Sequence, residues 1–444
     1  MMHHSLFGTD GIRTHIGHEP LTLESLPRLG IAIAQWAHET HGHIPTILLG
    51  HDTRQSCALI KAALQSGLLA YNAQVFDAQV IPTPGLYAII QTTQQFDVGI
   101  IISASHNPWH DNGIKIVDSQ RGKLSAHDEM RITTLFYEHA FTPNYLALGQ
   151  LHSYTQATAQ YTDYLTSFFA PHYLRGTTIA LDCAQGATAA LAPAIFAWFG
   201  ANVITINNQP TGFNINEQCG ALHLESLQKA VQENNADIGF AFDGDGDRVI
   251  AVTKQGDIKN GDDILALLIN HPAYAAVQSV IGTVMANQGF ESFLHSRTKQ
   301  LVRTNVGDKF VSERMEQEHS IIGGEQSGHI ILRDYLNTGD GIFTALRIIE
   351  TVLLTNNWTM ETFTKFPQVL INLKVGARKD LTLPACADII KQHSALVPHG
   401  RVFVRYSGTE PVLRILVEDS DESVAHAIGK QLSEELLKQL SYHD

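Results

Sequence analysis

The stretch Val98–Pro108 reads VGIIISASHNP and joins a short apolar run to a polar loop that ends in a proline. The same arrangement recurs at Ile238–Arg248, which reads IGFAFDGDGDR. A short apolar run bounded by glycine or proline is consistent with a fully buried strand. Both polar loops therefore follow buried strands, and loops beyond strand ends are where α/β sheets bind ligands.

Around these two stretches the chain repeats one order of strand, loop, helix and strand three times. Alternation of this kind predicts βαβ units in parallel or mixed sheets. The expected elements are strands at 46–49, 73–76 and 98–102 with a helix around 60–68; strands at 178–181, 203–206 and 238–242 with a helix at 187–199; and strands at 280–284, 300–303 and 320–322 with helices near 290–296 and from 308.

The last part of the chain follows another pattern, with strands expected at 369–375, 401–405 and 412–417, a helix around 386–393 and a closing helix. This order indicates a small α+β domain. The predicted fold class is therefore α/β, with three α/β domains of similar pattern followed by the α+β domain. The expected domain ranges are 1–152, 153–254, 255–366 and 367–444.

Length and composition limit the classes of function. The 444 residues are too many for one hydrophobic core, and a net charge of -14 argues against nucleic acid or an anionic membrane as partner. No stretch approaches the roughly 20 apolar residues of a membrane span. The four cysteines are scattered without a CxxC pair, which favours free thiols. Since no signal-peptide pattern opens the chain, we expect a cytoplasmic protein.

The loop after 98–102 offers a candidate nucleophile. Ser105 follows a buried strand on a loop held by Pro108, and the segment Asp111–Gly113 is expected to turn the chain back. A serine that only caps a turn is the simpler alternative, and the absence of G-x-S-x-G disfavours acyl transfer. His106 could act as a base or carry phosphate, and Lys115 could offset a phosphate or serve as an acid or base.

The loop after 238–242 offers a metal site. Asp243, Asp245 and Asp247 alternate with glycines, which lets three carboxylates point at one hard cation. An EF-hand is excluded because Arg248 and Lys254 stand where that loop requires glycine and glutamate. Three carboxylates leave ligand positions for water and phosphate, which favours Mg²⁺ over calcium. An ordinary surface turn remains the alternative.

Three further loops are weaker signals when taken singly. Arg405–Pro411 reads RYSGTEP, is followed by Arg414, and presents groups that grip phosphate. Gly323–His329 reads GGEQSGH and offers polar groups for sugar hydroxyls. Phe7–Arg13 reads FGTDGIR and is uninterpretable by itself. One chain thus combines a nucleophile, a metal loop, a sugar loop and a phosphate clamp, each at a strand end.

Together these motifs resemble those of the α-D-phosphohexomutase family. The match runs through the whole chain: FGTDGIR, SASHNPxxDNGIK, DGDGDR, GGEQSGH with TGDGI at Thr338–Ile342, and RYSGTEPxLR. SASHNP combined with DGDGDR is highly specific for that family. The resemblance implies four domains around a central cleft, the first three related to each other. The loop Thr304–Lys309 is similar to the one that faces the sugar in the family.

The resemblance also implies roles for individual residues. Ser105 would be the phosphoserine, and Lys115, Arg13 and His106 would stand near the transferred phosphoryl group. Asp243, Asp245 and Asp247 would bind Mg²⁺ together with a phosphoserine oxygen. The residues expected to bind substrate are Arg248, Glu325 and Ser327, and, for the phosphate that is not being transferred, Arg405, Ser407, Gly408, Thr409 and Arg414.

The expected reaction is the interconversion of glucosamine 6-phosphate and glucosamine 1-phosphate, as in bacterial members of the family. Glucosamine 1,6-bisphosphate would be the intermediate, and it or glucose 1,6-bisphosphate the activator. The sequence departs from the usual pattern of the family at two places: Thr14 replaces a glycine, and the usual CGSTH reads Cys219-Gly220-Ala221-Leu222-His223. The oligomeric state stays open, a homodimer included.

Three alternatives remain at this point. The same chemistry could act on glucose or mannose phosphates, because a 2-amino group is a small difference. A magnesium-dependent phosphatase could use the same serine and release inorganic phosphate. A non-catalytic sensor of sugar phosphates would bind its ligand without phosphorylation of Ser105.

Overall fold

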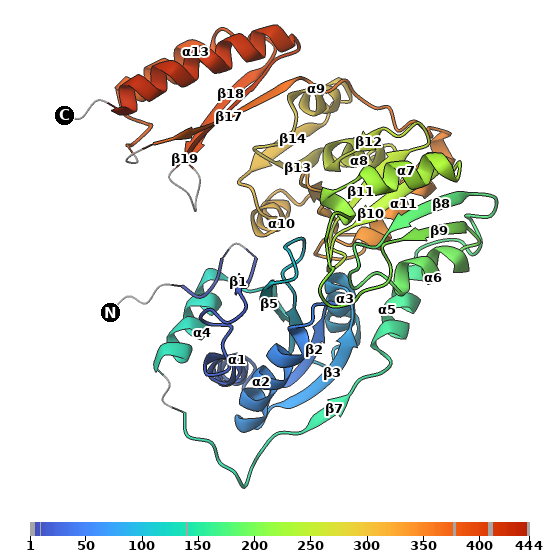
Figure 1. Cartoon of the computed structure of the whole chain (residues 1–444), viewed down its shortest axis with the longest axis vertical. Helices are drawn as coiled ribbons and strands as arrows, with labels where there is room; N and C mark the ends of the chain where they lie inside the picture. The colour runs from blue at the N-terminus through green and yellow to red at the C-terminus, as the bar shows by residue number, and fades with distance from the viewer. Residues whose placement is uncertain (1–4, 9, 139–140, 376–378, 407–411, 442–444) are drawn as a thin grey trace. The chain divides into compact units, whose positions relative to one another are not determined.

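The computed structural model describes the whole chain except residues 1–4, 9, 139–140, 376–378, 407–411 and 442–444 (Figure 1). It divides into two compact units. The first comprises Met1–Val284 and Val302–Glu361, and the second comprises Met285–Leu301 and Thr362–Asp444. Four separate sheets carry the fold of the described residues. Within the described ranges, no helix combines the length and apolar character that crossing a bilayer requires.

The first sheet has helices on both faces. In β4 (Val98–Ile102) alternate residues point to opposite sides: Val98, Ile100 and Ile102 join the core beneath α1, α2 and α4, while Gly99 lies against α3. The strands run in the order β1-β5-β4-β2-β3-β7, with β6 beside β5. The other elements are β1 (Ile12–His15), α1 (Ser25–His41), β2 (Thr46–His51), α2 (Cys57–Ala70), β3 (Gln74–Val80), α3 (Thr83–Thr93), β5 (Asp111–Asp118), β6 (Gly122–Lys123), α4 (Ala126–Glu138), β7 (Leu151–Ser153) and the following α5 (Ala157–Thr166).

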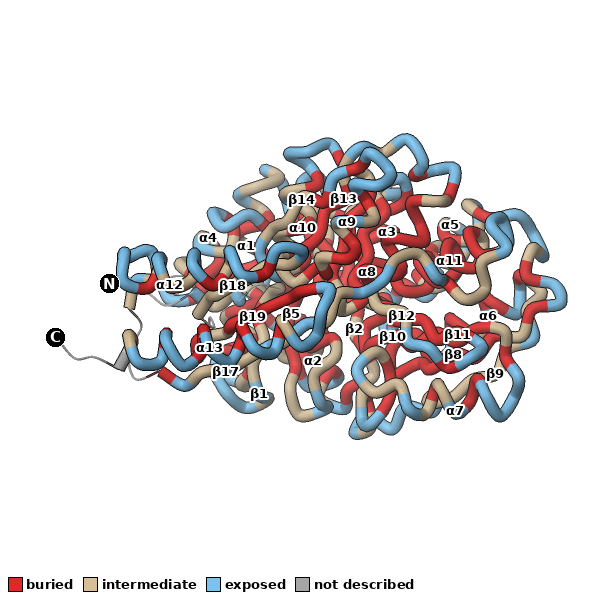
Figure 2. Tube along the Cα trace, turned by 90° about the horizontal axis from the view of Figure 1, so that it is seen from above, coloured by how far each residue is buried: buried red, intermediate tan, exposed pale blue. Residues whose placement is uncertain are grey.

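The second sheet repeats this arrangement in the order β12-β11-β10-β8-β9. Strands β10 (Ile238–Phe242) and β11 (Val249–Thr253) are buried along their whole length, as their red course in Figure 2 shows. Residues of β8, β10 and β11 pack under α7 through Leu227 and Val231. The remaining elements are β8 (Thr178–Asp182), α6 (Leu191–Trp198), β9 (Asn202–Ile206), the 3₁₀ helix η1 (Gly220–Leu222), α7 (Glu225–Glu233) and β12 (Ile258–Lys259).

The third sheet has the order β14-β13-β15-β16 and packs on α10 through Val311 and Met315. Two of its helices begin at side-chain caps: Asn260 and Asp263 form a capping box at α8, and Asp340 accepts a hydrogen bond from Phe343 N at α11. The elements are α8 (Gly261–Leu268), β13 (Ser279–Thr283), β14 (Gln300–Thr304), α10 (Asp308–Gln317), β15 (Ile322–Gly324), β16 (Ile330–Leu332) and α11 (Gly341–Thr355).

The second unit contains an antiparallel sheet in the order β17-β19-β18, with the hairpin β18–β19 as predicted. Its core forms between this sheet and α13 around Leu413, Ile415 and Leu432. The elements are α9 (Gln288–Ser296), β17 (Gln368–Lys374), α12 (Pro384–Ser394), β18 (Arg401–Tyr406), β19 (Val412–Glu418) and α13 (Glu422–Ser441). The predicted fold class, three α/β regions and a final α+β region, is therefore confirmed, as are four free, buried cysteines.

The first three sheets share one core topology. In each, a central strand lies parallel to an earlier strand and antiparallel to the strand that follows it: β4 between β2 and β5, β10 between β8 and β11, and β15 between β13 and β16. The loops that leave the central strands are the serine loop (Ser103–His110), the acidic loop (Asp243–Arg248) and the sugar loop (Glu325–His329). All three therefore occupy the same topological position.

Three local predictions were wrong. The helix expected at 187–199 begins at Leu191, because Pro193 lacks an N–H and is tolerated only in a first turn. The strand expected at 320–322 begins at Ile322, where pairing with β16 starts. Asp111–Gly113 is part of β5 and pairs with β1 instead of turning. Gly113 is needed there because a Cβ would lie 2.6 Å from the carbonyl oxygens of Ile12 and Ser103.

Candidate active site

Ser105 is fully buried at the tip of the serine loop and points at the acidic loop. Its Oγ donates to Asp243 Oδ2 at 2.6 Å. Its φ of 52° lies in the left-handed region, which is unfavourable for a residue other than glycine. Such a conformation persists only where the surroundings enforce it.

Several hydrogen bonds enforce the conformation of the serine loop. Ser105 N donates to Ser103 Oγ at 2.9 Å, and Ser105 O accepts from Arg54 Nη2 and from Asn216 Nδ2, both at 2.9 Å. Asp52, also buried, accepts from Ser103 Oγ at 2.7 Å and from Arg54 Nε at 2.9 Å. Asp52 and Arg54, which follow β2 at the same edge of the sheet, thus frame the loop. No role was predicted for Asp52 and Arg54 from the sequence, although their position in the loop directly after a predicted strand is the kind of place where site residues lie.

The acidic loop brings three buried carboxylates together. One ligand oxygen from each of Asp243, Asp245 and Asp247 lies within 4.8 Å of the others. Burial, with repulsion from Asp247 and Asp245, raises the pKa of Asp243 well above its usual value. For Asp247 burial alone would raise the pKa, but Lys115 and His329 hold it well below its usual value.

The oxygens that remain in this loop fit a divalent cation. Asp245 Oδ1 is buried and accepts no hydrogen bond from the described residues. Asp247 Oδ1 has only long ion-pair distances, 3.7 Å to His329 Nδ1 and 3.8 Å to Arg248 Nε. Buried carboxylate oxygens without donors are costly unless a cation compensates them, and an all-oxygen donor set suits Mg²⁺.

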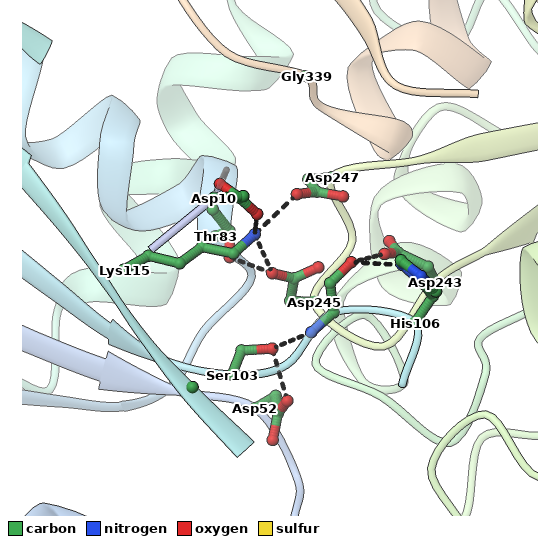
Figure 3. A network of polar contacts seen from close by, with 12 residues as sticks. Asp10, Asp52, Thr83, Ser103, His106, Lys115, Asp243, Asp245, Asp247 and Gly339 are labelled. Carbon is green, nitrogen blue, oxygen red and sulfur yellow. Dashed lines mark hydrogen bonds and ion pairs between the residues drawn. The ribbon is translucent and has the colours of Figure 1, made fainter. Parts of the chain in front are cut away.

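Lys115 connects the acidic loop to the first sheet. Its Nζ lies 2.9 Å from Asp245 Oδ2, 2.9 Å from Asp247 Oδ2 and 3.0 Å from Asp10 Oδ2 (Figure 3). Burial would lower the pKa of this amine, but the carboxylates raise it well above its usual value. The side chain therefore stays an ammonium ion, which favours charge compensation over proton transfer.

Asp10 and Thr83 are site residues that the sequence did not single out. Burial would raise the pKa of Asp10, but Lys115, Lys123 and Arg13 lower it. Arg13 Nη2 lies 2.6 Å from Asp10 Oδ2, so Asp10 holds both Arg13 and Lys115 in place. Thr83 Oγ1 donates to Asp245 Oδ2 at 2.6 Å. A pocket adjoins this group and is lined by Asp10, Thr83, Lys115, Lys123, Asp247, Asp308 and Lys309, among others.

His106 and Arg248 flank the serine. His106 Nδ1 lies 3.4 Å from Ser105 Oγ, and burial, Arg248 and Arg13 lower the pKa of the imidazole to about 4. The ring is therefore neutral at neutral pH. Burial would lower the pKa of Arg248, but Asp247 and Asp243 raise it. Arg248 N also donates to Asp243 Oδ1 at 3.1 Å, which helps to shape the acidic loop.

The sugar loop lies beside the same group of residues. Glu325 is buried, and its Oε1 accepts from Gly307 N at 2.9 Å, which joins it to the loop 304–309. Ser327 Oγ is buried without a hydrogen-bond partner among the described residues. A carboxylate and an unpaired hydroxyl are groups that can receive sugar hydroxyls.

The predicted phosphate clamp lies in the second unit. Arg405 and Arg414 are direct partners in the β18–β19 ladder. Burial and then the charge of Arg414 lower the pKa of Arg405. Like charges directly opposite each other are unfavourable, which an anion between them would relieve. Ser407, Gly408 and Thr409 lie outside the described residues.

Models of one protein family match the chain in order. They describe phosphoglucomutase/phosphomannomutase alpha/beta/alpha domain I at residues 4–142, domain II at 159–256, domain III at 260–369 and the C-terminal domain at 370–435. A relative from Lawsonia intracellularis, named phosphoglucosamine mutase, is 38% identical over 451 residues, covering 98% of this chain and 99% of the relative.

Solved structures show the same fold. A phosphoglucomutase/phosphomannomutase family protein from Burkholderia thailandensis has a TM-score of 0.82 at 21% identity, covering 100% of this chain and 99% of that one. An Aspergillus fumigatus N-acetylphosphoglucosamine mutase, solved with GlcNAc-6P and magnesium, has a TM-score of 0.62 at 18% identity, covering 88% and 82%. Since the family models follow one another along the chain and the curated relative matches nearly all of it, this chain belongs to the phosphoglucomutase/phosphomannomutase family of α-D-phosphohexomutases.

Proposed function

We propose that this phosphohexomutase interconverts glucosamine 6-phosphate and glucosamine 1-phosphate through a phosphoserine at Ser105. The observation that carries the proposal is the 2.6 Å contact between Ser105 Oγ and Asp243, made by a serine whose backbone is held from both sides. The amino sugar is chosen because the relative that matches the whole chain is named for it.

In this proposal Asp243, Asp245 and Asp247 hold Mg²⁺ together with an oxygen of the serine or its phosphate. When bound, the ion neutralises charge on the phosphoryl group during its transfer. Lys115 and Arg13 supply further positive charge, and Asp10 orients both. His106, neutral beside the serine, can accept a hydrogen bond or a proton.

The proposed reaction has two transfers. In the first, the bond between phosphorus and Ser105 Oγ breaks while one forms to O1 of glucosamine 6-phosphate; the O1 hydroxyl gives its proton to a base, and Ser105 Oγ takes a proton up. In the second, the bond between phosphorus and O6 of glucosamine 1,6-bisphosphate breaks while one forms to Ser105 Oγ; the serine hydroxyl gives up its proton, and O6 takes one up. The bisphosphate, or glucose 1,6-bisphosphate, also charges a serine that carries no phosphate.

Substrate recognition is divided among the remaining residues. Glu325 and Ser327 bind sugar hydroxyls, and Arg248 contacts a phosphate oxygen. Arg405, Ser407, Gly408, Thr409 and Arg414 hold the phosphate that is not being transferred. Because both ends of the bisphosphate present the same group, one clamp serves both transfers.

We propose in addition the domain ranges 1–152, 153–254, 255–366 and 367–444, and a cytoplasmic location.

Intact-protein mass spectrometry with peptide mapping tests the phosphoserine. We expect one phosphate on Ser105 that glucosamine 6-phosphate removes, with glucosamine 1-phosphate appearing in the medium. Inorganic phosphate as the main product would indicate the phosphatase instead. A serine that a sugar bisphosphate cannot charge would overturn the proposal in favour of a sensor.

Two further measurements test the sugar and the metal. Values of kcat/KM on glucosamine, glucose and mannose phosphates should rank glucosamine first, and a higher value for either other sugar would correct the substrate.

Asp245→Asn should weaken Mg²⁺ binding and lower kcat by roughly 100-fold or more, because the variant lacks one carboxylate that binds the ion, and the ion offsets charge in the transition state. Asp257→Asn, an exposed aspartate of the same region, is the matched control.

A further inference from the structure

Two histidines and an aspartate meet where the serine loop rejoins the first sheet. His15 ends β1 and is the ladder partner of Asp111, the first residue of β5. His110 directly precedes Asp111, and its carbonyl oxygen accepts from Ile16 N at 3.1 Å. The backbone pairing therefore places all three side chains at one corner of the sheet.

The donor atoms of these side chains are close enough to share an ion. One ligand atom from each residue lies within 4.8 Å of the others. His15 Nδ1 and Asp111 Oδ1 are 3.2 Å apart, and the rings of His15 and His110 have centroids 4.9 Å apart. Two atoms that each bind one tetrahedral ion at about 2.0–2.2 Å lie about as far apart as His15 Nδ1 and Asp111 Oδ1 do here. Small rotations of the partly exposed side chains would bring the third donor in.

We propose that His15, His110 and Asp111 bind a borderline divalent cation of the Zn²⁺ class. Two imidazole nitrogens and one carboxylate suit Zn²⁺, Co²⁺, Ni²⁺ and Cu²⁺, whereas Mg²⁺ takes oxygen ligands. The acidic loop offers oxygen ligands alone, so the two sites select different metals. The side chain of His15 is 49% exposed and that of Asp111 is 26% exposed, which leaves the site open to solvent and room for a water ligand.

A contact behind the site supports a ligand role for Asp111. Its Oδ2 accepts from Asn107 Nδ2 at 3.0 Å, while Oδ1 faces His15. A metal-binding carboxylate is typically oriented by such an outer hydrogen bond. Asn107 O in turn accepts from Arg54 Nη2 and Asn216 Nδ2. A bound cation would thus join β1 to the returning end of the serine loop.

Calorimetric titration of the full chain with Zn²⁺, in excess Mg²⁺, tests the site. We expect one Zn²⁺ to bind, and His110→Gln and His15→Gln each to weaken binding by at least about tenfold, the smaller loss known for disturbed metal sites. His43→Gln should leave binding unchanged: this exposed histidine also pairs with an aspartate, Asp97, but it belongs to no three-donor group among the described residues.

Cu²⁺ as a second probe identifies the ligands directly. The wild-type spin-resonance spectrum should show hyperfine splitting from imidazole nitrogen, and both glutamine variants should lose part of it. Circular dichroism checks that the variants fold. Unchanged Zn²⁺ affinity in both variants, or Cu²⁺ spectra identical to the wild type, would overturn the proposal. Neither readout depends on mutase activity, so the result is independent of the proposed function.

Discussion

The serine loop and the acidic loop occupy the same topological position, but they are held in different ways. The serine loop is fixed through its backbone, whose carbonyls accept from Arg54 and Asn216. The acidic loop is also held through its backbone, since Thr83 N donates to Asp245 O and Gly341 N to Gly246 O, but its carboxylates need partners as well: Lys115 pairs with two of them, and Thr83 Oγ1 donates to Asp245. The uncharged serine therefore depends on the position that its loop gives it, while the clustered carboxylates depend on charge compensation.

The largest expected effect comes from removing the group that the serine loop positions. Ser105→Ala should lower kcat by roughly 10⁴-fold or more, because the variant lacks the hydroxyl that is proposed to carry the phosphoryl group. The affinity for Mg²⁺ and for sugar phosphate, measured by calorimetry, should change little. A variant that keeps wild-type turnover would show that another residue is the nucleophile.

Removing the ammonium group of Lys115 should destabilise the acidic loop, whose carboxylates it compensates. Lys115→Met leaves Asp10, Asp245 and Asp247 without their ammonium partner, and the free energy of unfolding should fall by about 3–5 kcal/mol. Lys115→Arg is the matched variant that keeps the charge and should lose less. Denaturant unfolding of both measures the difference, and equal stabilities would refute the charge-compensation account.

A weaker change should separate positioning from metal binding. Arg54→Lys keeps the charge near Asp52 but cannot bond several loop carbonyls at once. We expect kcat to fall by up to about 100-fold, the cost of a small misplacement, at unchanged Mg²⁺ affinity. A parallel loss of Mg²⁺ affinity would mean that the two loops are not held independently.

The smallest expected effect is a dependence of stability on pH that comes from Asp340, at the start of the helix that contacts the acidic loop. Gly341 N donates to Gly246 O, and Asp340, which caps the same helix, has its pKa raised to about 6 by burial. Folded Asp340 thus keeps its proton between about pH 4 and 6 while the unfolded chain loses it. Stability should fall across this window by about 3 kcal/mol and then level off. Thermal melts of Asp340→Asn should lack this part of the pH dependence.

Two of the strands that end at the site, β4 and β10, could be predicted to the residue because they are continuous apolar runs with clear ends, whereas β15 begins two residues later than expected. The serine loop and the acidic loop could be singled out for the same reason, since each follows such a strand. Asp10, Asp52 and Asn216 were missed because their importance lies in contacts with residues far along the chain. The start of α6 was missed for a different reason. Apolar periodicity predicts a helix from residue 187, but Pro193 is tolerated only in a first turn, so the helix begins four residues later, at Leu191.

The bridge made by Lys115 has a consequence for how the protein is made. Its ammonium ion needs Asp245 and Asp247, which leave the ribosome more than a hundred residues later. A nascent chain that ends before the acidic loop can pair this lysine with Asp10 alone and cannot bury it at low cost. The first sheet is therefore a poor choice for expression as a separate fragment, and a split version of the enzyme should be cut after β12, where the second sheet is complete.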